Sequence, residues 1–190
     1  LNLTNITWNE DSGLPTQNIF DIQKTKEGFI WLATDEGLIR FDGTNFKVFN
    51  RENVPLFTRK FVTHLFVDNE NNIWLSDGIL GLFKFSNKKF SKVIFNNFKK
   101  DFRDISGIKK INDKLYISSR SMGLLIINGN KYTLIDTSYG LKSDRVNRFY
   151  ISGDSVFISV LGDGIYLLYK NKLIKPEFNK YLSSRFINVI

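Results

Sequence analysis

The first repeat of the chain reads Ile19-Phe-Asp-Ile22, Phe29-Ile-Trp31-Leu-Ala-Thr34, Gly37-Leu-Ile-Arg-Phe41 and Asn45-Phe-Lys-Val-Phe49. Each run is four to six residues long and rich in β-branched and aromatic residues. Polar turns that contain Gly, Asn, Asp or Lys separate the runs, which is typical of short strands joined by hairpins. The stretch therefore predicts a four-stranded antiparallel unit.

The same pattern recurs three more times along the chain. An aromatic residue occupies the centre of the second run of each repeat, and we call it the anchor; the four anchors are Trp31, Trp74, Tyr116 and Phe157, at spacings of 43, 42 and 41 residues. A glycine opens the third run of each repeat; these glycines are Gly37, Gly81, Gly123 and Gly164. A period of about 40–45 residues with four short strands is typical of β-propeller blades.

The predicted fold is all-β: a β-propeller fragment of four four-stranded blades plus the first strand of a fifth. We expect the blades at residues 14–50, 57–95, 103–136 and 144–175. We also expect an N-terminal strand at 1–8 that belongs to a closing blade, and the start of blade 5 at 185–190. Orphan strands at both ends would leave unpaired sheet edges, so we expect the natural protein to continue beyond Ile190 with further blades.

Composition narrows the chemistry that this segment can carry. The chain has no cysteine and one histidine, His64, which excludes disulfides and thiol nucleophiles and disfavours triad chemistry. We expect His64, in a first strand, to be structural. The net charge is +8, but the lysines are scattered through turns, where they serve solubility and edge protection rather than nucleic-acid binding. We find no phosphate loop, paired carboxylates or nucleophile elbow, and expect no catalytic residue, cofactor or metal.

Two stretches carry a family resemblance: Trp8-Asn-Glu-Asp-Ser-Gly-Leu-Pro-Thr-Gln-Asn-Ile19, and Gly28-Phe-Ile-Trp-Leu-Ala-Thr34 with the following Asp35-Glu-Gly-Leu-Ile-Arg-Phe-Asp-Gly43. Together they resemble the two-component regulator propeller repeat. Ala33 stands where that repeat usually has Gly, and the later repeats depart further. The departures are Ser76-Asp77, Tyr116 and Phe157.

The resemblance implies a function. Members of this family place one or two periplasmic propellers before an immunoglobulin-like domain, a membrane helix and a histidine kinase or other output. The chain is thus expected to be the extracytoplasmic, ligand-sensing propeller of a transmembrane receptor, with a glycan-derived ligand such as an oligosaccharide. Its other expected partners are further blades of the same chain and a second receptor copy in a homodimer, with the membrane reached only through the full-length protein.

Ligands of propellers generally bind at loops that join blades or that join the second and third strands. The candidate ligand-binding residues in these loops are Asp35, Arg59, Asp77, Arg103, Arg120, Arg145, Asp163 and Arg185. Arg145 and Arg185 align in successive repeats, and guanidinium groups pair well with carboxylates and other acceptors. The alternative interpretation is that these arginines tie blade to blade through backbone carbonyls or Asp144.

Two other functions remain open at this stage. Propellers also serve as interaction scaffolds that bind protein partners, and some are lyases or hydrolases whose acid and base project from loops. The near absence of histidine and the short loops disfavour an enzyme. A signal peptide upstream in the gene would exclude an intracellular scaffold.

Overall fold

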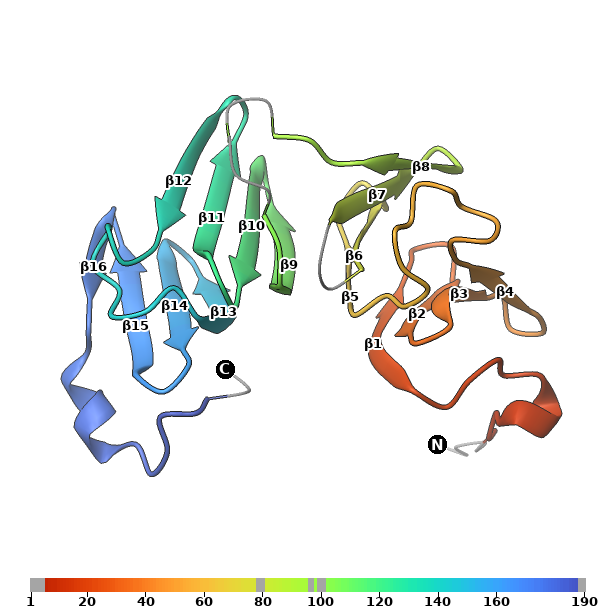
Figure 1. Ribbon diagram of the computed structural model, residues 1–190, viewed down its shortest axis with the longest axis horizontal. Helices are drawn as coiled ribbons and strands as arrows, with labels where there is room; N and C mark the ends of the chain where they lie inside the picture. Colours follow the sequence, from red (N-terminus) through yellow and green to blue (C-terminus); the bar gives the residue numbers. More distant parts are fainter. Residues whose placement is uncertain (1–5, 78–80, 96–97, 99–101, 188–190) are drawn as a thin grey trace. The chain divides into compact units, whose positions relative to one another are not determined.

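The computed structural model describes residues 6–77, 81–95, 98 and 102–187 (Figure 1). Its strands form four four-stranded antiparallel sheets, each in simple sequence order, which confirms the predicted all-β fold of four blades. The chain divides into two compact units, Leu1–Asp77 with Phe83–Lys92 and Gly78–Leu82 with Val93–Ile190. Apart from Leu82, blades 1 and 2 lie in the first unit, and blades 3 and 4 lie in the second.

The first unit begins with a 3-10 turn, η1 (Glu10–Ser12), that Asn9 caps, and then contains two blades. The strands of blade 1 are β1 (Ile19–Lys24), β2 (Ile30–Thr34), β3 (Gly37–Phe41) and β4 (Phe46–Phe49). The strands of blade 2 are β5 (His64–Val67), β6 (Ile73–Ser76), β7 (Leu82–Ser86) and β8 (Lys89–Lys92).

The second unit contains two blades and a C-terminal 3-10 turn, η2 (Glu177–Tyr181). The strands of blade 3 are β9 (Ile105–Ile111), β10 (Lys114–Ser119), β11 (Gly123–Asn128) and β12 (Lys131–Ile135). The strands of blade 4 are β13 (Val146–Ser152), β14 (Ser155–Val160), β15 (Gly164–Tyr169) and β16 (Lys172–Ile174).

Burial follows the position of a strand in its blade. The second strands β2, β6 and β10 are buried almost throughout, whereas the fourth strands β8 and β12 are largely exposed. A middle strand is packed on both faces of its sheet, so it reads as a continuous apolar run. Each unit has its own hydrophobic cluster, centred on Leu38 and Leu75 in the first and on Leu124 and Ile158 in the second.

The repeated glycine has a steric reason. Gly37 and Gly123 adopt φ values of 126° and 88°, which side chains resist. A Cβ at Gly37 would overlap the carbonyl oxygen of Phe49, and one at Gly123 would overlap that of Ile135. The glycine therefore lets the third strand start directly against the end of the fourth strand.

Each first strand of blades 1, 3 and 4 is interrupted at one residue, which leaves Phe20, Ser106 and Asn147 at an irregularity in the ladder. In the second unit this residue links successive repeats: Ser106 Oγ donates to the Val146 carbonyl (2.7 Å), and Asn147 Nδ2 donates to the Ile187 carbonyl (2.9 Å). Val146 and Ile187 are thus equivalent, 41 residues apart.

That register corrects one sequence interpretation. If Ile187 is equivalent to Val146, then Arg185 is equivalent to Asp144 and not to Arg145. The sequence alignment was wrong by one residue because it matched arginine with arginine, whereas the hydrogen bonds follow the backbone position of the first strand.

The two predicted end strands lie only partly among the described residues. Residues 6–8 and 185–187 are not in strands, and residues 1–5 and 188–190 lie outside the described residues. No helix in the part of the chain that the structure describes is long and apolar enough to cross a membrane.

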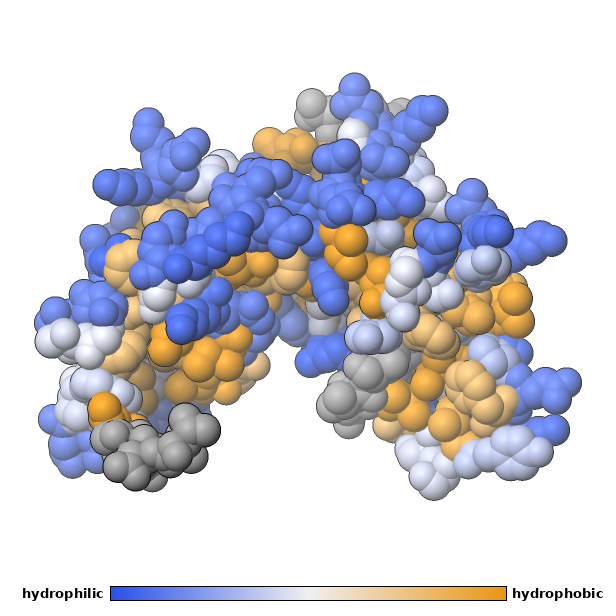
Figure 2. Space-filling view, turned by 180° about the vertical axis from the view of Figure 1, so that it is seen from behind, coloured by the Kyte–Doolittle hydropathy of each residue, from blue (hydrophilic) through white to orange (hydrophobic). Residues whose placement is uncertain are grey.

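Hydrophobic side chains also reach the surface of both units (Figure 2). Along β1, Phe20 and Ile22 are 55% and 59% exposed, and near the C-terminus Phe186 is 65% exposed. The first strand of blade 1 thus presents apolar side chains to solvent.

Candidate functional site

The loops that follow the second strands hold three of the predicted acidic residues, and all three have partners within the fold. Asp35 and Asp77 are each the first residue after a second strand. Asp35 accepts hydrogen bonds from Thr16 Oγ1 (2.8 Å) and Asn18 Nδ2 (2.7 Å), and Asp77 accepts one from Thr58 Oγ1. In both blades the threonine lies 19 residues before the aspartate, so this pair is a repeated tie between the entry to a blade and its second strand.

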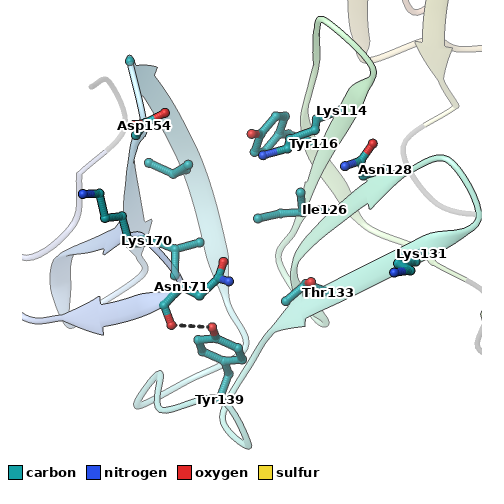
Figure 3. A pocket seen from close by; sticks show the side chains of 13 residues that line it. Lys114, Tyr116, Ile126, Asn128, Lys131, Thr133, Tyr139, Asp154, Lys170 and Asn171 are labelled. Atoms are coloured by element: carbon teal, nitrogen blue, oxygen red, sulfur yellow. Dashed lines mark hydrogen bonds between the residues drawn. The ribbon is translucent and has the colours of Figure 1, made fainter.

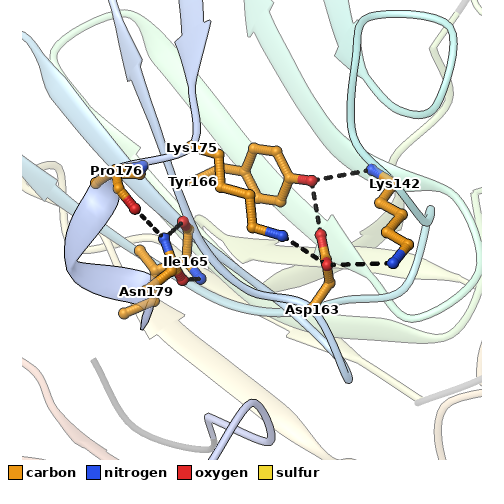
Figure 4. Close-up of polar contacts among 7 residues, drawn as sticks. All are labelled: Lys142, Asp163, Ile165, Tyr166, Lys175, Pro176 and Asn179. Atoms are coloured by element: carbon orange, nitrogen blue, oxygen red, sulfur yellow. Dashed lines mark hydrogen bonds and ion pairs between the residues drawn. The ribbon is translucent and has the colours of Figure 1, made fainter. Parts of the chain in front are cut away.

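Asp163, in the equivalent loop of blade 4, is buried and even more fully satisfied (Figure 4). It accepts from Tyr166 Oη (2.6 Å) and Lys175 Nζ (2.6 Å), and Lys142 Nζ lies 3.9 Å away. The residues belong to three segments, namely the loop after β12, the β14–β15 turn with β15, and the stretch after β16. Asp163 therefore joins these segments rather than facing a ligand.

The pKa shifts agree with structural roles for these carboxylates. The hydrogen bond from Asn18, assisted by that from Thr16, lowers the pKa of Asp35. Burial acts to raise the pKa of Asp163, but the hydrogen bonds from Lys175 and Tyr166 and the charge of Lys142 outweigh burial and lower it. Burial and the hydrogen bond to Asp163 raise the pKa of Tyr166 to about 12.

The predicted arginines behave differently, because their side chains are exposed. Arg59 in the first unit lies beside the ring of Phe61, with Cζ 5.7 Å from the ring centroid. The next residue, Lys60, pairs with Glu36 at 2.5 Å. The loop edge of the first unit thus carries charges of both signs.

In the second unit, four predicted arginines gather along one loop edge. We call them the arginine edge: Arg103, Arg120, Arg145 and Arg185, all exposed.

Hydrogen bonds to main-chain carbonyls hold the arginine edge together. Ser119 Oγ donates to the Arg103 carbonyl (2.6 Å), and the Arg120 amide donates to the carbonyl of Asp104 (2.9 Å). Around the next loop, the Leu161 amide donates to the Arg145 carbonyl (2.8 Å) and the Gly162 amide donates to that of Arg185 (3.2 Å). These bonds use the backbones and leave the guanidinium groups of Arg103, Arg145 and Arg185 on the surface.

One residue of this region was missed by the sequence analysis. Arg148, in β13, donates from Nη1 to the carbonyls of Ser106 and Asn147 and so links the first strands of blades 3 and 4. Arg120 Nε donates to Asn147 Oδ1 (3.2 Å) and is tied to the same place. Arg148 thus joins blades through backbone carbonyls, a role that the sequence analysis considered only for Arg145 and Arg185.

The arginine edge has the chemistry of a binding surface. Exposed guanidinium groups can form paired hydrogen bonds with carboxylates or sulfates. No group of three or more His, Cys, Asp or Glu side chains within the described ranges is arranged to hold a metal ion.

Comparison with known proteins finds a family match in blade 1. Residues 13–36, which include β1 and β2, match the family described as "Two component regulator propeller". The resemblance drawn from the sequence is confirmed over these residues. A search of curated proteins finds no match.

Solved structures show where the same fold occurs. The extracellular domain of the hybrid two component system BT3049 from B. thetaiotaomicron matches with a TM-score of 0.77 and 20% identity, over 90% of this chain and 26% of that one. The corresponding domain of BT4673 from the same organism gives 0.70 and 17%, over 86% and 25%. A streptogramin B lyase gives 0.65 and 15%, over 85% and 55%. The chain spans about a quarter of the two extracellular domains, and the fold alone does not separate binding from catalysis.

Proposed function

We propose that the chain is part of the extracytoplasmic, ligand-sensing propeller of a transmembrane two-component receptor. The observation that carries the proposal is the match of residues 13–36 to the two-component regulator propeller repeat. The fold shared with extracellular domains of hybrid two component systems supports it. In such a receptor this segment lies in the periplasm, binds a ligand and performs no phosphotransfer or other catalytic step.

We further propose that the ligand is an oligosaccharide derived from glycan breakdown. The arginine edge supports this chemistry, because guanidinium groups donate in pairs to carboxylate, sulfate or neighbouring sugar hydroxyl groups. Three of its side chains make no side-chain hydrogen bond or ion pair within the described residues: Arg103, Arg145 and Arg185.

The same receptor needs protein contacts as well as a ligand. We propose that further blades pack against the exposed apolar side of β1, where Ile19, Phe20 and Ile22 are 43%, 55% and 59% exposed. A homodimer of the full receptor is the second protein partner in this proposal.

A thermal-shift screen tests the ligand class. The chain is melted with a panel of neutral and acidic oligosaccharides, and a specific ligand at about a hundredfold excess over its Kd adds about 2.7 kcal/mol of stability. A sugar that raises the melting temperature supports the proposal. Silence across the panel, from a chain that melts cooperatively, contradicts glycan sensing by these blades and favours a propeller that binds protein partners.

Variants then test the arginine edge. Arg145→Gln removes one exposed charge from the edge, and Arg51→Gln removes one exposed charge from a turn in the first unit. We expect Arg145→Gln to lower the affinity for the sugar that the screen identifies, and Arg51→Gln to leave it unchanged. Equal affinities of the two variants would show that the sugar binds elsewhere on the chain.

A further inference from the structure

A second surface of the second unit has binding chemistry that neither the sequence interpretation nor the arginine edge uses. Between blades 3 and 4 lies a cavity of about 490 Å³, on the side of the hairpin turns. We call it the lysine cleft and define it by Lys114, Tyr116, Lys131, Tyr139, Asp154 and Lys170. Its volume falls within the range of about 300–1,000 Å³ that is usual for small-molecule sites.

Side chains from the two blades face each other across the cleft (Figure 3). Tyr116, the anchor of blade 3, is 8% exposed, and its ring packs against Phe149 with centroids 6.1 Å apart. Its hydroxyl points into the cleft and makes no hydrogen bond within the described residues. Tyr139 Oη donates to the Asn171 carbonyl (2.8 Å) and so joins blade 4 to the linker that precedes it.

The charge of the cleft is unbalanced. Three lysines line it, each from a different hairpin, together with one carboxylate, that of Asp154. Lys114, Lys131 and Lys170 form no ion pair with any residue that the structure describes. Three lysines against one carboxylate leave the lining with an excess of positive charge, which attracts an anion. The ammonium of Lys170 also lies 5.2 Å from the ring centroid of Tyr169, outside the lining.

The lining also offers groups that suit a sugar ring. Tyrosine presents an apolar ring face together with a hydroxyl, and Thr133, Asn128 and Asn171 add neutral donors and acceptors. A cavity with aromatic and amide groups and an excess of positive charge fits a small polar ligand that carries an anionic group. Lysine suits such a group because its ammonium is a compact charge with three donors.

We infer that the lysine cleft binds an acidic sugar, a mono- or disaccharide that carries a carboxylate or sulfate. The anionic group lies among Lys114, Lys131 and Lys170, and the ring lies beside Tyr116. This inference rests on the proposed function, because it takes the ligand to be a glycan, and it assigns a second sugar site, on the hairpin side of blades 3 and 4 and apart from the arginine edge.

The experiment measures binding of two probes to the whole chain by calorimetry and by NMR. The acidic probe is digalacturonate and the neutral probe is lactose. The test variant is Lys114→Gln with Lys170→Gln, and the control variant is Lys24→Gln with Lys92→Gln, two exposed lysines of the first unit that do not line the cleft. Both variants lose the same charge, so a non-specific effect of net charge would appear equally in both.

We expect the chain to bind digalacturonate more tightly than lactose, with shifts of amide resonances near Tyr116 and Asn128. We expect the cleft variant to lose at least tenfold in affinity and the control variant less than twofold. Weakening of binding at high salt would agree with the charge argument.

Two results overturn the inference in different ways. If digalacturonate binds the cleft variant as well as the control, or if lactose binds and digalacturonate does not, the cleft assignment fails while glycan sensing stands. If neither these probes nor any oligosaccharide of the screen binds a folded chain, the proposed function fails together with the inference.

Discussion

The lysine cleft has a counterpart in the first unit, at the same place in the repeat. The cavity between blades 1 and 2, about 660 Å³, is lined at the equivalent positions by Trp31 for Tyr116, Phe85 for Leu168 and Lys88 for Asn171. In the first unit Trp31 stacks on Phe49 with ring centroids 5.8 Å apart and contacts Phe85 at 5.3 Å.

The charges of the two cavities differ as well. Around the first cavity, Arg40, Lys47 and Lys88 face Glu27 and Glu70, so cations and carboxylates nearly balance. Around the lysine cleft, three lysines face one carboxylate. One backbone frame therefore supports a cavity lined by stacked aromatic rings in one unit and a cavity with a larger excess of cations in the other. The difference comes from a few side chains on equivalent strands and turns.

The two anchors of the first unit, Trp31 and Trp74, also differ in the hydrogen bonding of their indole groups although they occupy equivalent positions. Trp74 Nε1 donates to Asp68 Oδ2 (2.8 Å), whereas Trp31 Nε1 is buried without a hydrogen-bond partner. The residue six positions before Trp31 is Thr25, where blade 2 has Asp68. The two hairpin turns are otherwise alike. The backbone amides of Thr25 and Asp68 each donate to the carbonyl four residues later in the chain.

The largest expected loss of stability comes from removing Trp31 from its stack of aromatic rings. We expect Trp31→Ala to lower the free energy of unfolding of the first unit by about 3–5 kcal/mol, because it leaves a cavity among Phe49 and Phe85. Urea denaturation followed by circular dichroism measures this loss. A loss below about 1 kcal/mol would show that the stacked rings contribute little to stability.

A smaller loss is expected when blade 2 receives the turn residue of blade 1. Asp68→Thr removes the acceptor of the buried Trp74 Nε1, and it leaves the Asn72 side-chain amide with Glu70 Oε2 (3.1 Å). Leaving buried donors unsatisfied costs about 2–3 kcal/mol. Urea titration of this variant beside wild type checks the value, and an unchanged midpoint would mean that other acceptors replace the carboxylate.

The reciprocal change is expected to stabilise. Thr25→Asp places a carboxylate six residues before Trp31, where it can accept from Trp31 Nε1 and from backbone amides of its own turn. We expect a gain of about 1 kcal/mol, the usual net value of a hydrogen bond. Thr25→Asn, which offers a neutral acceptor, is the matched control, and a loss of stability in both variants would show that the first turn cannot orient the new side chain.

The smallest effect on stability is expected in the lysine cleft. Tyr116→Phe removes a hydroxyl that makes no hydrogen bond within the described residues, so the change at neutral pH should be below about 0.5 kcal/mol. Burial raises the pKa of Tyr116 above its ordinary value of about 10. Its protonated form therefore stabilises the wild type fully below about pH 10, and this contribution is lost as pH rises through the folded-state pKa.

Thermal melts between about pH 8 and pH 11 separate the two chains. The wild type should lose melting temperature more steeply than Tyr116→Phe near the top of this range. Parallel curves would show that Tyr116 titrates alike in the folded and unfolded states.

Much of the fold could be predicted because it depends on local chemistry. Alternating apolar runs and turn residues define each strand, and the glycines at 37 and 123 were recognised from their repeat position before their steric reason was visible. The loop location of the candidate residues also follows from the repeat. Their partners do not, because Thr16 and Thr58 are far in sequence from Asp35 and Asp77 and no local pattern marks the pairs.

The lysines of the lysine cleft show most clearly what could not be predicted from the sequence. From sequence, Lys114 and Lys170 are turn residues with a role in solubility, and each hairpin taken alone supports that interpretation. Only the packing of blade 4 beside blade 3 brings the three hairpins to one cavity. Similarly, only the hydrogen bonds to Ile187 show that Arg185 stands where Asp144 stands in the preceding repeat.

The sequence by itself determined the repeat, the strands and the positions of the glycines and anchors, because strand periodicity and turn chemistry act over a few neighbouring residues. The tertiary structure decided which acids are neutralised, which arginines stay exposed and where a cationic cavity forms. These outcomes depend on which side chains meet across blades about 40 residues apart in the chain, and that is a matter of packing and electrostatics in space rather than of local pattern.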